Sequence, residues 1–297
     1  MIPPAATSKT LRLGAARRLQ TTQHRAFAAP GGAGGIAGSL KSDMDGSVGN
    51  KISGIVRFYK KVGVSDVEAE GGSSAYSVTL DGKTVKTPMR TPLQLPIKSM
   101  AVAVAQEWDA QEERIKPALM PIMTLASTAL DLNKTSSKEE LVNEMLHYLN
   151  SDTLCYQVTA DQQEKLAVLQ QKKWDPIRKW FVDQFEGELD IAHGSIGRLT
   201  HDETIIEGIR QQLLQRSEFE LVPLRAITKE CKSLITAWAL FKRHITAKEA
   251  MNISRVEEEF QIGRWGLVEG GHDLDRVNCS VNLASASFFL WLQQNQV

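Results

Sequence analysis

The sequence predicts an α+β fold in which a small N-terminal β-rich domain is followed by a larger all-α domain. Two observations support this fold class. Apolar and polar residues alternate before an Asp-Gly pair at positions 81–82, and after Pro96 the apolar spacing changes from two residues to about 3.6. We therefore expect a β-rich domain over residues 55–96 and a helical domain over residues 97–297.

The β-rich domain is predicted from its turn chemistry. Apolar residues alternate through 76–80, Asp81-Gly82 follows, and Val85 resumes the pattern. An Asp-Gly pair after an alternating segment is a strong signal for a β-hairpin, so Asp81 and Gly82 are expected to have a structural role in the turn. Residues 54–64 are the expected partner strand.

The first helices of the second domain are predicted from apolar spacing and capping residues. Pro96 is expected to open a helix with Met100, Val104 and Trp108 along one face. A second helix is expected from about Pro121 to residue 132. Ser137, with a glutamate three residues later, forms a capping box for a third helix.

Three further helices are expected in the C-terminal half. Asp175 and Pro176 would cap and open one of them, residues 224–243 would form a long and nearly buried helix, and Thr246 would begin another with a capping box. We expect this last helix to continue through Phe260 to about Gly263, with a loop after it.

The N-terminal segment has the composition of a targeting sequence. Residues 1–42 contain no Asp or Glu but six Lys or Arg residues. This pattern is typical of a mitochondrial presequence, which predicts import to the matrix. Arg25, Phe27 and Ala28 resemble a processing site, so we predict a presequence over residues 1–27 with cleavage after Phe27. The Gly- and Ser-rich residues 28–54 are expected to form a flexible linker.

Composition excludes several functional classes. Removal of the presequence takes away five of the 35 basic residues and none of the 35 acidic ones, which leaves a net charge of −5. A mildly acidic chain does not favour nucleic-acid binding. No apolar window approaches the roughly 20 residues that cross a bilayer, so no membrane insertion is expected. The three cysteines are widely spaced, which fits a reducing compartment and predicts no cysteine metal site.

The sequence lacks the common catalytic signatures. It contains no P-loop, no GxSxG and no HExxH motif. Glu257, Glu258 and a third glutamate at 259 are consecutive, and because successive helical residues point about 100° apart they do not all face one ligand. No cofactor or metal is expected. A matrix metal-dependent hydrolase that uses Glu258 with His272 or His147 remains an alternative, as does a general helical scaffold protein.

A second polar cluster lies at the end of the first predicted helix. Glu107, Trp108 and Asp109 end this helix, and Pro121 begins the next. A tryptophan is commonly half-buried, and its N–H then needs a partner. We expect Trp108 to anchor the β-rich domain to the helices.

Several motifs, taken in order, resemble one known family. They are RFYKKV, VTLDGKTVKTP, AQEWDAQEERIKPALMPIMTLASTALD, YLNSDTLCY, KWDPIRKW and RVEEEFQIGRWG. They resemble the mitochondrial ATP synthase assembly factors that chaperone the alpha subunit of the catalytic head (assembly factor 2 type). The resemblance implies an ATP-independent chaperone that is not an enzyme, and that binds unassembled alpha subunit, prevents its aggregation and hands it on for assembly. A monomer is the natural form for a protein that holds one subunit.

The resemblance also implies roles for particular residues. The partner-binding motif of the family falls on Glu257, Glu258, Phe260, Gln261 and Trp265. Its critical acid corresponds best to Glu258, with Glu257 as the alternative.

A second motif of the family is structural. Its Glu-Trp-Asp corresponds to Glu107, Trp108 and Asp109, and the resemblance implies that Trp108 is needed for folding.

Overall fold

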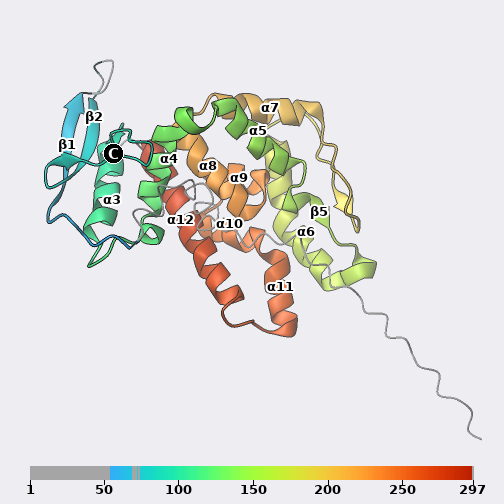
Figure 1. The fold of residues 1–297 in the computed structure, drawn as a ribbon. Helices are drawn as coiled ribbons and strands as arrows, with labels where there is room; N and C mark the ends of the chain where they lie inside the picture. Colours follow the sequence, from blue (N-terminus) through green and yellow to red (C-terminus); the bar gives the residue numbers. More distant parts are fainter. Residues whose placement is uncertain (1–53, 69–71, 73, 296–297) are drawn as a thin grey trace, which may run out of the picture. The chain divides into compact units, whose positions relative to one another are not determined.

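The computed structural model describes residues 54–68, 72 and 74–295. A small antiparallel sheet precedes a larger set of helices, as the sequence predicts (Figure 1). The strands are β1 (Val62–Glu68), β2 (Ser74–Leu80), β3 (Lys83–Thr84), β4 (Gln94–Leu95), β5 (Tyr156–Gln157) and β6 (Ala192–His193). The α-helices are α3 (Lys98–Asp109), α4 (Pro121–Thr135), α5 (Lys138–Leu149), α6 (Ala160–Val182), α7 (Glu203–Leu214), α8 (Glu218–Cys231), α9 (Leu234–Phe241), α10 (Ala247–Ser254), α11 (Val256–Trp265) and α12 (His272–Asn295).

The predicted hairpin at Asp81-Gly82 is present. β2 pairs with β3 across this turn, and both turn residues have positive φ, 48° and 80°. The expected partner strand is wrong in position, because β2 pairs along its whole length with β1, which begins at Val62. Residues 54–61 form no strand; Val56 makes an isolated bridge to Arg114, and Arg57 and Tyr59 bind the end of α3 instead.

The second and third expected helices are confirmed, and the first begins slightly later than expected. α3 begins at Lys98, so Pro96 precedes the helix and does not open it. α4 begins at Pro121, and Ser137 and Glu140 form the predicted capping box at the start of α5. These signals are local, which explains why the sequence is sufficient to place them.

Asp175 and Pro176 do not begin a helix, so that prediction is wrong. They lie inside α6, where the Asp175 carboxylate pairs with Arg178. The proline removes one backbone hydrogen bond, but Trp174 and Phe181 are completely buried on either side of it. Tertiary packing therefore maintains the helix through a residue that usually ends one.

The two long helices expected in the C-terminal half are each divided in two. Lys232, with φ of 50°, separates α8 from α9, and the Ser233 side chain accepts a hydrogen bond from the Thr236 N–H at the start of α9. Arg255 separates α10 from α11. The expected loop after Gly263 is short, because α12 begins at His272.

The helical core is centred on α8 and α9. Every residue of α9 is buried, α4, α5 and α12 pack against α8, and α6 and α10 pack against α9. The short parallel pair β5 and β6 lies within this otherwise helical region. The sheet joins the same core through contacts of β1 and β2 with α3.

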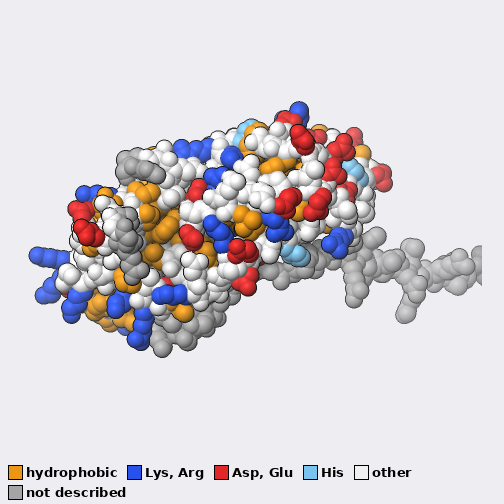
Figure 2. All heavy atoms as spheres, turned by 90° about the horizontal axis from the view of Figure 1, so that it is seen from above, with side chains coloured by type: hydrophobic (Ala, Val, Ile, Leu, Met, Phe, Trp, Pro, Cys, Tyr) orange, Lys and Arg blue, Asp and Glu red, His pale blue; other side chains and the backbone are white. Residues whose placement is uncertain are grey.

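Hydrophobic and acidic side chains are unevenly distributed over the surface. Seen from above, hydrophobic side chains gather toward the side on which the sheet and α3 lie, whereas acidic side chains gather toward α6 and α7 (Figure 2). Across residues 54–68, 72 and 74–295, no helix combines the length and apolar character needed to cross a membrane.

Candidate partner-contact site

The predicted partner-binding motif lies on a helical hairpin that projects from the rest of the helices (Figure 1). We call residues 255–276 the α11–α12 hairpin; it comprises α11, the connecting loop and the start of α12. Arg255 begins it with φ of −107° and ψ of 15°, which interrupts the helical path after α10. Gly266 and Gly270 have positive φ, 89° and 72°, which allows the chain to reverse between the two helices.

Arg255 organises the acids of this hairpin. Its side chain is only 6% exposed and forms ion pairs with Glu258 on α11 and Asp275 on α12, and a weaker one with Glu259 at 3.5 Å. Arg276 of α12 donates to Glu259 at 3.1 Å. These pairs connect the two helices near their base, so Glu258 is part of the element that fixes the hairpin geometry.

Glu257 is oriented differently from Glu258. Its carboxylate accepts a hydrogen bond of 2.7 Å from the Gln170 side-chain amide on α6. Burial raises the pKa of the Glu257 carboxyl, and the hydrogen bond from Gln170 opposes this only in part. Glu257 therefore joins α11 to the core, whereas Glu258 lies beside the buried Arg255.

The outer part of the hairpin is apolar and exposed. Phe260 is half-buried against the core, and Gln261 is exposed. Trp265 is 70% exposed, with the Arg264 guanidinium 5.5 Å from its ring centroid. Leu267 and Val268 in the following loop are also exposed. The hairpin therefore presents large apolar side chains beyond a base of ion pairs.

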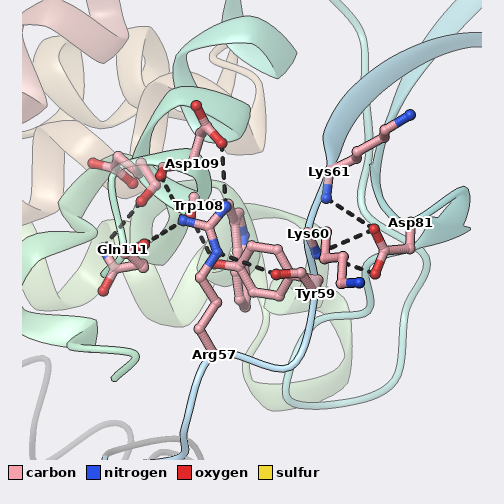
Figure 3. Close-up of polar contacts among 9 residues, drawn as sticks. Arg57, Tyr59, Lys60, Lys61, Asp81, Trp108, Asp109 and Gln111 are labelled. Carbon is pink, nitrogen blue, oxygen red and sulfur yellow. Dashed lines mark hydrogen bonds and ion pairs between the residues drawn. The ribbon is translucent and has the colours of Figure 1, made fainter. Parts of the chain in front are cut away.

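Trp108 and Asp109 lie where residues 57–59 meet the end of α3 (Figure 3), and Glu107 precedes them in the same helix. Trp108 is buried and forms an edge contact with the Tyr59 ring at 5.6 Å, and the Tyr59 hydroxyl donates to the Trp108 carbonyl at 2.6 Å. Arg57 donates to the Asp109 carbonyl at 2.9 Å and to its carboxylate at 3.3 Å. These contacts tie residues 57–59 to the end of α3.

The indole N–H of Trp108 does not find the partner expected from the sequence. It is buried and has no hydrogen-bond partner among the described residues. The polar connection at this corner is made instead by the main chain of Trp108, which accepts the hydrogen bond from Tyr59.

Glu107, on α3, caps the N-terminus of α4. Its two carboxylate oxygens accept hydrogen bonds from the N–H groups of Ile122 at 2.8 Å and Met123 at 2.7 Å, in the first turn of α4. Burial raises the pKa of Glu107 to about 7, against the effect of these two hydrogen bonds. Glu107 therefore connects α3 to α4 at a helix N-terminus, where a carboxylate satisfies free N–H groups.

Asp81 does more than form a turn. Its carboxylate accepts hydrogen bonds from the backbone N–H groups of Lys60 at 3.1 Å and Lys61 at 2.8 Å (Figure 3). These two bonds lower the pKa of Asp81. Asp81 thus joins the β2–β3 turn to the segment that precedes β1, and Gly82 supplies the positive φ of that turn.

The residues considered for a metal-dependent enzyme are not brought together. Glu258 pairs with Arg255, His272 accepts from the Val268 N–H at 3.2 Å, and His147 is exposed on α5. Within the part of the chain that the structure describes, no group of three or more His, Cys, Asp or Glu side chains is arranged to hold a metal ion.

Sequence reasoning missed two residues that shape the hairpin. Arg255 is not among the site residues that the sequence predicts, yet it is the buried centre of the ion pairs. Its spacing of three and four residues before Glu258 and Glu259 is the available signal, because such pairs face one another on a helix. Gln170 has no comparable signal, since it is 87 residues from Glu257. The predicted cleavage residues Arg25, Phe27 and Ala28 lie outside the described residues.

Comparisons with known proteins agree on one family. A family model described as the ATP12 chaperone protein matches residues 56–182. The protein atp12, mitochondrial, of Schizosaccharomyces pombe is 27% identical over 218 residues, which cover 71% of this chain and 75% of that protein. The protein ATP12, mitochondrial, of Saccharomyces cerevisiae is 25% identical over 261 residues, which cover 74% and 79%. The crystal structure of Atp12 from Paracoccus denitrificans superimposes with a TM-score of 0.70 at 29% identity, over 80% of this chain and 97% of that one.

Proposed function

Since the chain belongs to the ATP12 chaperone family, we propose that it binds the unassembled alpha subunit of mitochondrial ATP synthase, prevents its aggregation and hands it on for assembly of the catalytic head. An unassembled subunit exposes apolar interface that drives association with the wrong partners. A chaperone that covers this interface needs exposed apolar surface of its own, together with a means of choosing its client.

The observation that supports this proposal best is the α11–α12 hairpin. It places exposed apolar side chains, Trp265 among them, beyond a base in which Arg255 holds Glu258. An apolar contact edged by acids selects a partner by charge as well as by area. We propose Glu258, Glu257, Phe260, Gln261 and Trp265 as the partner-contact residues, with Glu258 acting partly by fixing the hairpin through Arg255.

The rest of the proposal concerns location, mechanism and organisation. We propose that it acts in the mitochondrial matrix, because residues 1–27 have the composition of a presequence and the yeast relatives carry mitochondrial names. We also propose that it acts as a monomer, the natural form for a protein that holds one subunit. We propose that it acts without ATP and without catalysis, since its sequence carries no P-loop or common catalytic motif. A β-rich domain to residue 96 would precede the helical domain.

We propose structural roles for a second set of residues. Their contacts join segments that are distant in sequence and so maintain the scaffold behind the hairpin. They are Glu107, Trp108, Asp109, Asp81 and Gly82.

The test is refolding of denatured alpha subunit in the presence of this chain. Light scattering would report aggregation, and analytical ultracentrifugation would report a one-to-one complex. We expect wild type to suppress scattering, Glu258→Lys to lose most of this effect, and Glu258→Gln to keep part of it because an amide oxygen still accepts from Arg255. Glu139→Lys is the matched control, since Glu139 is an exposed glutamate in the first turn of a helix remote in sequence.

Circular dichroism would verify that each variant is folded. Binding lost in a folded Glu258→Lys variant but retained in Glu139→Lys supports the proposed site. A wild-type chain that neither binds alpha subunit nor keeps it dispersed contradicts the proposal. Equal suppression of aggregation for unrelated matrix proteins would instead favour the general scaffold.

A further inference from the structure

The outward face of α12 carries an apolar stripe that the partner-contact motif does not include. Its large side chains are between 44% and 60% exposed. Together with Ala284 they recur at alternating spacings of three and four residues, and we call this set the α12 stripe: Leu274, Val277, Val281, Ala284, Phe288 and Trp291. Phe288 and Trp291 stack on one another with ring centroids 6.1 Å apart.

These six residues form one continuous face. At about 100° per residue they fall within an arc of about 100° on the helix, opposite the side that packs on α8. Their exposed apolar area is on the order of 500 Å², because a large side chain presents about 150–250 Å² when fully exposed. A patch of this size is at the upper end for a monomer, and such patches are commonly functional.

Charge divides the surface around the stripe into two parts. Residues 277–297 contain no Asp, Glu, Lys, Arg or His. The adjoining α11–α12 hairpin, residues 255–276, contains six acidic and three basic residues. At the other end of α12 the exposed Arg243 donates to the Gln294 side chain at 2.8 Å. The stripe therefore runs from a net acidic end at the hairpin to an end bordered by a cation, which fits an apolar partner whose basic groups lie toward the hairpin.

We propose that the α12 stripe binds an amphipathic helix of the client protein, with apolar side chains at three- and four-residue spacing and basic residues toward the α11–α12 hairpin. This inference rests on the proposed function and names the client element and the surface that it would contact. Anchors at such spacing are the usual way in which one helix binds another. The stripe would extend the contact made by Trp265 along the length of α12.

A second copy of this chain fits the stripe less well. A stable dimer buries about 800 Å² on each partner, which exceeds the exposed area of the stripe. In a parallel pair the acidic hairpin would meet a second acidic hairpin, and in an antiparallel pair it would meet the end of the other α12, where Arg243 already donates to Gln294. A modest apolar area also suits a chaperone that must release its client.

The test compares two valines of similar exposure. Val277 on the stripe is 60% exposed, and Val168 on α6 is 58% exposed. The full chain would be prepared as wild type, Val277→Lys and Val168→Lys, with circular dichroism to verify folding. One arm measures binding to denatured alpha subunit. The other measures fluorescence anisotropy of a labelled helical peptide with leucines at alternating three- and four-residue spacing and lysines at one end.

We expect Val277→Lys to weaken both interactions at least tenfold and Val168→Lys to change neither. Phe288→Ser is a second stripe variant that introduces no charge, and it should also weaken both. If wild type binds the peptide but not alpha subunit, the proposed function fails. In that case the fluorescence anisotropy of the peptide still tests whether the stripe binds a helix. Binding unchanged in both stripe variants overturns the inference, as does a wild-type dimer that Val277→Lys converts to monomer.

Discussion

Removal of the Arg255 guanidinium tests whether the α11–α12 hairpin depends on its ion pairs. Arg255→Met keeps the buried aliphatic volume but removes the donors to Glu258, Glu259 and Asp275. A hydrogen bond between charged groups contributes about 1.5–3 kcal/mol. The three carboxylates are partly exposed and regain water, so we expect the free energy of unfolding to fall by about 3 kcal/mol in total and not by the sum of three such bonds.

Guanidinium denaturation followed by circular dichroism would measure this change. Lys179→Met is the matched control, because Lys179 is 77% exposed and pairs with Asp183 at 3.1 Å. Such a surface pair contributes less than about 1 kcal/mol. The reasoning is refuted if Arg255→Met stays within 0.5 kcal/mol of the control, since the ion pairs would then not stabilise the fold.

Three further predictions concern the corner around Trp108 and the hairpin turn. Burial raises the pKa of Glu107 in the folded chain from its ordinary value of 4.5 to about 7, so the folded state retains a proton that the unfolded state loses. The free energy of unfolding should therefore fall by up to about 3 kcal/mol as pH rises from 4.5 to 7. Urea titrations at pH 5 and pH 8 would measure this fall, which should be smaller in Glu107→Gln than in wild type. An equal fall in both proteins contradicts the raised pKa of Glu107. Tyr59→Phe should cost about 1 kcal/mol in thermal denaturation, because the Trp108 carbonyl loses the Tyr59 donor and keeps the longer hydrogen bond of 3.3 Å from the Gln111 N–H, and no loss would show that the Gln111 hydrogen bond is sufficient. Asp81→Ala should lower the thermal denaturation midpoint, since it loses two hydrogen bonds and places alanine at φ of 48°; the control Asp81→Asn should lower it less, and equal losses would refute the role of the conformation.

Features set by neighbouring residues were predictable from the sequence. The turn at Asp81-Gly82 and the capping boxes at Ser137 and Thr246 depend on a few adjacent side chains, and all three are present. The breaks at Lys232 and Arg255 were not predictable in the same way. Neither residue is glycine or proline, and the local signal at the first break is confined to Ser233, whose side chain caps α9.

The orientation of the acids in the candidate site also depends on such a break. On one uninterrupted helix, Glu257 and Glu258 would both lie at the edge of the exposed face. The change of path at Arg255 turns Glu257 toward Gln170 on α6 and leaves Glu258 beside Arg255. A contact that joins residues far apart in sequence decides this, so periodicity alone does not distinguish the two acids.

The packing of α12 has a consequence for how this protein itself is made. α12 contacts α3 and α4, which precede it by well over a hundred residues, and it covers α8 at the centre of the core. Until α12 is available, the apolar surface of α8 that it covers has no partner, and such a chain is prone to aggregate. A chaperone of this design would thus need protection during its own synthesis and import, before it can protect another chain.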